Sequence, residues 1–207
     1  MTGQLSMDLI SDPALYAERL VFNAPTPDPE MPTLPIRRCA FTAMELKKSP
    51  IAGQDESGTE AQDLKKRLHD TLEACIRMGY RHFFTSATQG IELWAAEMVL
   101  SLRDQNPGIV LELVIPYDTH SNKWSDETRE RYMAVREQAD IVTTISHAYE
   151  KGAIFARNRY LMENCQLFLT VYIPEAETAT EKLAKRASWN GKQVCNVPVI
   201  RPNRRVA

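Results

Sequence analysis

Apolar and polar positions along this chain follow two patterns. Short continuous apolar runs are typical of strands buried on both faces, whereas apolar residues that recur every three or four positions indicate amphipathic helices. The runs predict strands at residues 36–42, 80–86, 109–115, 140–145, 166–173 and 194–200. The segments between them predict helices at residues 57–79, 90–104, 125–138, 153–163 and 178–190.

This alternation predicts the fold class. Consecutive strands are too far apart for hairpins, so they need right-handed crossovers, which make neighbouring strands parallel. We therefore expect an α/β fold: a Rossmann-like, doubly wound, mostly parallel six-stranded sheet with helices on both faces. Two capping boxes, Ser57-Gly58-Thr59-Glu60 and Thr178-Ala179-Thr180-Glu181, mark helix starts, and Gly79 ends the first of these helices.

The first 35 residues differ from the rest. They hold six of the 12 prolines, and proline lacks the N–H that central strands and helix interiors require. We expect residues 1–35 to form a proline-rich arm and residues 36–207 to form the Rossmann-like domain. The arm would pack on the domain or on a second subunit, so the sequence leaves a homo-oligomer open.

Composition and charge narrow the function classes. The 207 residues have a formal net charge of −2, which disfavours a dedicated nucleic-acid binder. The chain opens without a secretory signal, and no apolar run approaches the roughly 18 residues of a membrane span. The four cysteines are too widely spaced for a C-x-x-C motif, so we expect reduced thiols in a cytoplasmic protein without a metal or a cofactor.

The loop from Ser86 to Glu92 is the most informative candidate site. It leads from a predicted strand directly into a helix, where free backbone N–H groups can bind an anion. Glu92 in the first helical turn would repel a phosphate placed on it. Its carboxylate therefore either accepts hydrogen bonds from ribose hydroxyls or only complements the helix dipole.

Several motifs in this region occur together and in a recognisable order. They are Gln89-Gly90-Ile91-Glu92-Leu93-Trp94-Ala95-Ala96-Glu97, Ile115-Pro116-Tyr117, Trp124, Tyr132, Ala139-Asp140, Ser146, Tyr149, Arg157-Asn158, Tyr160-Leu161-Met162 and Tyr172. In order and approximate spacing, the chain resembles the YpsA-type proteins of the SLOG superfamily, which also holds the Lonely-guy and DprA-like proteins. The resemblance implies a Rossmann-like fold with a cleft for a nucleotide-type small molecule.

The chain also departs from this family pattern. Ala43 and Ala87 stand where family members carry glycine, and Glu175-Ala176-Glu177-Thr178 replaces a Gly-Gly-Thr phosphate loop. Added Cβ atoms hinder close backbone approach to a phosphate, and the glutamates add repulsion. We therefore expect a cleft with narrower and more acidic walls, which disfavours pyrophosphate-bearing ligands.

From these observations we expect a protein that binds or senses a nucleotide derivative. The expected ligand contacts are Ser86, Thr88, Gln89, Gly90, Glu92, Trp124, Arg157 and Asn158. Trp124 would stack on a base or pack at an interface, and Arg157 and Asn158 would complete the site from a helix whose Ile154, Leu161 and Met162 face inward.

Two other functions are weighed against binding. By analogy with the Lonely-guy branch, the alternative is hydrolysis of a nucleotide N-glycosidic bond, although the Pro-Gly-Gly-x-Gly-Thr motif of that branch is absent. Single-strand nucleic-acid binding ranks third, because the basic tail (Arg201, Arg204 and Arg205) is short.

Overall fold

A computed structural model describes residues 36–49, 51 and 56–199. The predicted arm, residues 1–35, lies outside the described residues, and its packing stays a prediction. Within the described part, no helix is both long enough and apolar enough to span a bilayer.

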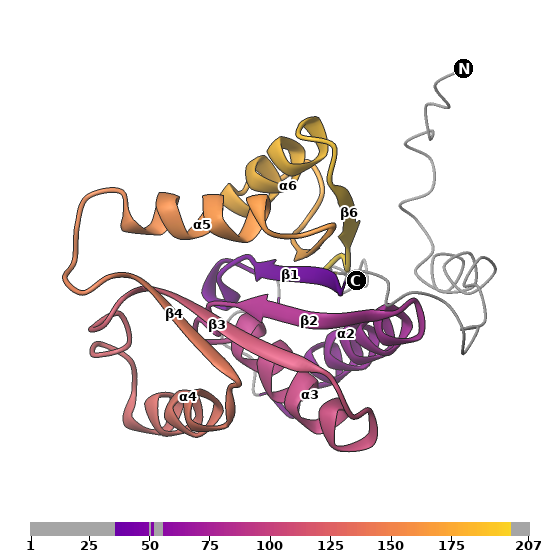
Figure 1. Cartoon of the computed structure of the whole chain (residues 1–207), viewed down its shortest axis with the longest axis horizontal. Coiled ribbons are helices and arrows are strands. Elements are labelled where there is room, and N and C mark those ends of the chain that lie inside the picture. Colours follow the sequence, from indigo (N-terminus) through magenta and orange to yellow (C-terminus); the bar gives the residue numbers. More distant parts are fainter. Residues whose placement is uncertain (1–35, 50, 52–55, 200–207) are drawn as a thin grey trace, which may run out of the picture.

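Six strands form one sheet in the order β4-β3-β2-β1-β5-β6 (Figure 1). Each pair of neighbouring strands is parallel, so the predicted α/β sheet is confirmed and is entirely parallel. After β1, the chain adds β2, β3 and β4 in turn on one side of β1, and then adds β5 and β6 on the other side. The switch point therefore lies between β1 and β5, where open α/β sheets bind ligands at the carboxyl ends of the strands. The strands are β1 (Arg37–Ala43), β2 (Tyr80–Thr85), β3 (Val110–Tyr117), β4 (Ile141–Ser146), β5 (Leu167–Val171) and β6 (Gln193–Asn196).

Helices cover both faces of the sheet, as predicted (Figure 1). One face carries α2 (Thr59–Arg77), α3 (Ile91–Gln105) and α4 (Asp126–Gln138). The other carries α5 (Ala153–Glu163) and α6 (Ala179–Trp189). A short 3-10 helix, η2 (Leu46–Lys48), follows β1 and has no counterpart among the predicted elements.

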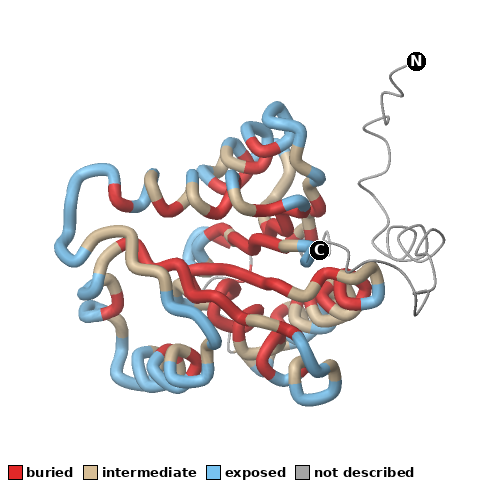
Figure 2. The backbone as a smooth tube through the Cα atoms, in the orientation of Figure 1, coloured by how far each residue is buried: buried red, intermediate tan, exposed pale blue. Residues whose placement is uncertain are grey.

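The sheet separates two apolar cores, and its inner strands β1, β2, β3 and β5 are largely buried, whereas the edge strand β4 is exposed or only partly buried (Figure 2). The larger core lies under α2 and α3 and includes Leu68, Trp94 and Leu111. The smaller core lies under α5 and α6 and includes Phe84 and Phe168. Because both faces are covered, the strands read as continuous apolar runs in the sequence.

The helices largely begin and end where the sequence predicts, but two predictions about them are corrected by the structure. Thr178 caps α6 by accepting a hydrogen bond from the Glu181 amide, as the capping box predicts. The first capping box is wrong, because the N-cap of α2 is Gly58, which has no side chain to accept a bond. The inward position predicted for Ile154 is also wrong: it is 51% exposed near the start of α5, where that helix extends beyond the sheet.

Among the described residues, three other than glycine have a positive φ: Ala87 (47°), Glu175 (63°) and Glu177 (51°). Ala87 stands where the sequence resemblance leads us to expect glycine, and Glu175 and Glu177 lie in the stretch where it leads us to expect a Gly-Gly-Thr loop. The backbone therefore keeps a left-handed conformation although the side chains disfavour it, at a cost of roughly 1–2 kcal/mol per residue.

This strain gives a prediction for Glu177, whose side chain is exposed. Replacing Glu177 with glycine should raise the free energy of unfolding by about 1 kcal/mol, because relief of the φ strain outweighs the added freedom of the unfolded chain. Urea denaturation measures the change. Glu177→Ala is the matched control, since it removes the carboxylate but keeps the Cβ, and it should leave stability nearly unchanged. Equal stabilisation by both variants would assign the effect to charge instead of backbone conformation.

Candidate functional site

Glu92 lies where the carboxyl ends of β1 and β2 meet the start of α3. It is 5% exposed, and its carboxylate is held by groups from the end of β1 and from the β2–α3 loop. Oε1 accepts hydrogen bonds from the Thr42 hydroxyl (2.8 Å) and the Ala43 amide (3.2 Å), while Oε2 accepts one from the Thr88 amide (3.2 Å). The carboxylate therefore fixes the end of β1 to the β2–α3 loop.

Arg157 reaches this carboxylate from α5, on the opposite face of the sheet. Its Nη1 donates to the Ser86 hydroxyl and lies 3.7 Å from Glu92 Oε2. Ser86 in turn donates to the Val114 carbonyl (2.8 Å), which links the group to β3. Arg157 is only 9% exposed, and its Nε has no hydrogen-bond partner within the described part of the chain. A buried guanidinium with unused donor capacity is suited to an anionic group of a ligand.

The remaining residues of the β2–α3 loop serve different purposes. Gly90 has a φ of 91°, and an added Cβ would lie 3.0 Å from Leu46 Cβ, so glycine permits both the turn and the close packing of η2. Thr88 contributes its backbone amide to Glu92. Gln89 is exposed at the surface of the turn.

An aromatic cluster follows β3 and contains the predicted residue Trp124. The rings of Trp124, Tyr132 and His120 meet edge to face, with centroids 5.1–5.3 Å apart. The pKa of His120 is lowered to about 4, mainly by burial and in addition by the positive charges of Arg157 and Arg136, while the hydrogen bond to the Tyr117 carbonyl and the charge of Glu92 oppose this shift. His120 is therefore neutral at physiological pH, and its Nδ1 donates to the Tyr117 carbonyl (3.1 Å).

The predicted residues are thus only partly brought together. Ser86, Glu92, Arg157 and the Thr88 backbone form one bonded network, whereas Trp124 belongs to the neighbouring aromatic cluster. The Oδ1 of Asn158 is buried and accepts no hydrogen bond from any described residue. Thr42 was not among the predicted contacts: its hydroxyl lies at a strand end, but its partner depends on the strand order.

A second buried polar cluster lies outside this network, between the sheet and α5. Glu112 on β3 accepts hydrogen bonds from His82 (2.8 Å), Thr143 (2.7 Å) and Tyr160 (2.8 Å). Burial alone would raise the pKa of Glu112, but these hydrogen bonds outweigh it and hold the pKa below its ordinary value. The carboxylate is therefore ionised and fully partnered inside the protein.

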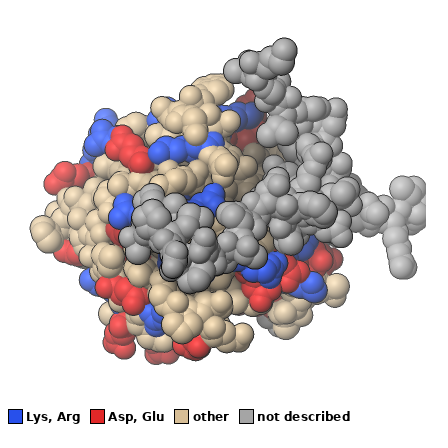
Figure 3. Space-filling view, turned by 45° about the vertical axis from the view of Figure 1, so that its right-hand side comes forward, with Lys and Arg blue, Asp and Glu red and all other residues tan. Residues whose placement is uncertain are grey.

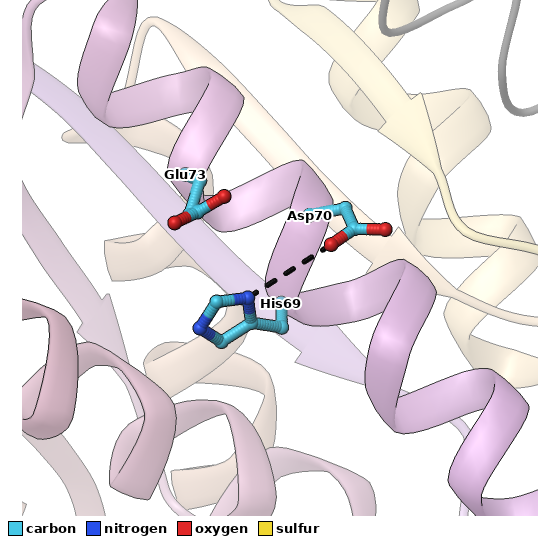
Figure 4. A group of neighbouring side chains, drawn as sticks. All are labelled: His69, Asp70 and Glu73. Atoms are coloured by element: carbon cyan, nitrogen blue, oxygen red, sulfur yellow. Dashed lines mark ion pairs between the residues drawn. The ribbon is translucent and has the colours of Figure 1, made fainter.

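One group of potential metal ligands occurs among the described residues, on α2 (Figure 4). His69, Asp70 and Glu73 offer ligand atoms within 4.8 Å of one another. Asp70 is already paired with Lys66 (2.7 Å) and Glu73 with Arg77 (3.5 Å), and all three side chains are more than 40% exposed. Such neutralised surface groups are ordinary features of a solvated helix, so we assign no metal to them.

The surface adds two observations. A hollow of about 260 Å³ lies against α2, lined among others by Thr59, Asp63 and Val199, and none of the predicted site residues lines it. On the face seen in Figure 3, positive and negative side chains are interspersed between neutral ones, without a broad field of one sign. The described residues visible on this face therefore form no extended basic surface of the kind that binds a nucleic-acid backbone.

Comparison with known proteins places these features in a family. The family model YpsA, described as the YspA SLOG family, matches residues 51–202, well over half of the chain. A UPF0398 protein of Bacillus pumilus (strain SAFR-032) is 31% identical over 139 residues, which is 66% of this chain and 74% of that protein. A UPF0398 protein of Bacillus cereus (strain B4264) is 29% identical over 144 residues, 69% of this chain and 77% of that protein.

Proposed function

This chain belongs to the YpsA SLOG family, and from that premise and the geometry of its strand ends we propose that it binds a nucleotide derivative at the carboxyl edge of the sheet. The ligand would lie over Ser86, Glu92 and Arg157, beside the switch point. Thr88, Gln89 and Gly90 form its loop wall, and Trp124 and Asn158 complete the surroundings.

The observation that supports this proposal is the environment of Arg157. The side chain crosses from α5 to the strand ends, is nine-tenths buried, and keeps Nε free of any partner among the described residues. Burying an under-used guanidinium is costly unless another group pairs with it. A ligand phosphate would supply that group. Glu92, whose Oε2 lies 3.7 Å from Nη1 of Arg157, positions the guanidinium for this phosphate.

The alternative, hydrolysis of an N-glycosidic bond, is favoured by one observation, the close approach of Glu92 to Arg157. The other contacts of Glu92 favour binding. Three hydrogen bonds and a guanidinium occupy its carboxylate, so it is poorly placed to attack a sugar carbon or to activate water. We therefore rank binding first and hydrolysis second.

The decisive experiment is calorimetric titration with AMP and adenosine. Removing a charged hydrogen-bond donor costs about 1.5–3 kcal/mol, so Arg157→Met should bind AMP at least about tenfold more weakly. Affinity for adenosine should change less. Arg159→Met is the matched control, because Arg159 is on the same helix but its side chain is 60% exposed, and it should bind like the wild type.

Two outcomes would contradict the proposal. One is the absence of binding of both compounds by the folded wild type, and the other is unchanged AMP affinity in a folded Arg157→Met variant. Chromatography of the same mixtures for free adenine tests the alternative, since release of base by the wild type that is lost in Arg157→Met would favour hydrolysis over binding.

We also propose the cytoplasm as the location of this protein. All four cysteines are free and buried, which fits a reducing compartment. Nucleic acid remains the least supported partner, in keeping with the net charge of −2.

A further inference from the structure

The loop between β5 and α6 has the backbone shape of an anion-binding nest. Glu175 and Glu177 have φ values of 63° and 51° and direct their amides toward the Glu181 carboxylate ahead of the start of α6, whereas the intervening Ala176 amide donates to the Ile173 carbonyl (3.3 Å). The loop follows Val171, which pairs with Ala43 across the switch point, and the amide of Ala43 donates to Glu92. The nest is therefore one strand away from the proposed ligand site.

A carboxylate of the protein itself already occupies this nest. Glu181, in the first turn of α6, is only 3% exposed, and its Oε1 accepts hydrogen bonds from the Glu175 amide (3.2 Å) and from Lys185 (2.9 Å). Its Oε2 is buried and has no partner among the described residues. Burial raises the pKa of Glu181, but Lys185 and the amides of Glu175 and Glu177 outweigh it, so the group is ionised.

The other two glutamates of this loop differ from Glu181 because their side chains are exposed. The side chains of Glu175 and Glu177 face solvent, so the acidic character of the nest comes from Glu181. An ionised carboxylate held by inward amides and a lysine has the charge and the partners that a bound phosphate would have. A ligand phosphate could enter only by displacing it.

We propose that Glu181 determines ligand specificity by filling the anion position of the β5–α6 loop, so that the site admits nucleosides and nucleoside monophosphates but excludes a second phosphate. This proposal rests on the proposed function for the identity of the ligand. The exclusion itself is a property of the loop and can be tested without a nucleoside.

The test uses pyrophosphate as the probe and calorimetry of the full-length protein. Glu181→Ala removes the internal anion and leaves Lys185 free, so its affinity for pyrophosphate should exceed that of the wild type by at least about tenfold. Glu181→Gln keeps an acceptor for the Glu175 amide and should fold even if the alanine variant does not, with a smaller gain of the same sign. Glu177→Ala removes an exposed charge from the same loop and should show no gain.

The outcomes separate this inference from the proposed function. Equal pyrophosphate affinity in the wild type and in a folded Glu181 variant would overturn the role of Glu181. A gain at Glu181 together with no binding of adenosine or AMP would leave that role intact and reject the nucleotide ligand. If both hold, ADP should bind the wild type no more tightly than AMP, and Glu181→Ala should reverse that order.

Discussion

Replacing Glu112 with alanine should lower the free energy of unfolding by about 3–5 kcal/mol, the cost of breaking a buried charged network by removing one partner. The carboxylate is 5% exposed and accepts from His82, Thr143 and Tyr160, all of which lose their acceptor. Urea denaturation monitored by circular dichroism measures the loss. Glu163→Ala is the matched control, because Glu163 is 61% exposed and its 4.0 Å ion pair contributes little.

The pH dependence of stability gives the same network a second test. Because the folded pKa of Glu112 is below its unfolded value, its contribution to stability is fully present above about pH 4.3 and is lost as the pH falls through the folded pKa. The wild type should therefore lose more stability than Glu112→Ala between pH 5 and pH 3, roughly the range in which unfolded glutamates titrate. Parallel pH profiles for the two proteins, or a loss below 1 kcal/mol at pH 7, would contradict this account.

The elements of the fold could be predicted because local signals determine them. The apolar run at residues 109–115 corresponds to β3 (Val110–Tyr117), and Gly79, with a φ of 86°, lies directly after the C-cap of α2. Helices between strands also force parallel pairing. The strand order was beyond this reasoning, because nothing local in the sequence states that β5 pairs with β1 on the side opposite β2.

The candidate site was harder to predict for the same reason. Ser86 and Glu92 are close in sequence, but the partners that define them, Thr42 and Arg157, come from distant elements. Glu181 illustrates a further difficulty: the sequence pattern correctly predicts the cap at Thr178, yet the Glu181 side chain accepts from the Glu175 amide and not from the Thr178 amide that a full capping box requires. That contact depends on two positive φ values that glutamate rarely adopts, and the residue types alone give no signal for them.

Glu92→Gln should destabilise the protein by about 2–3 kcal/mol, because an amide cannot replace a carboxylate that only accepts hydrogen bonds. If the Gln oxygen takes the place of Oε1 and keeps Thr42 and Ala43, its NH₂ group faces the Thr88 amide and the Arg157 guanidinium, both of which are donors. In the opposite orientation the NH₂ group faces the Ala43 amide, which is a donor, although the Thr42 hydroxyl can turn to accept from it. One buried donor therefore loses its acceptor in either case, as denaturation of the variant should show.

A double-mutant cycle with Arg157→Met separates the structural role of Glu92 from its role toward Arg157. In the Arg157→Met background the guanidinium is absent, so Glu92→Gln should cost less than in the wild type, by about 1 kcal/mol or more of coupling. Additive effects would mean that the 3.7 Å approach of the two charges carries no energy. Glu92 would then only stabilise the end of β1, and Ser86 alone would position Arg157. Glu92 would in that case have no reason to be placed in the ligand site.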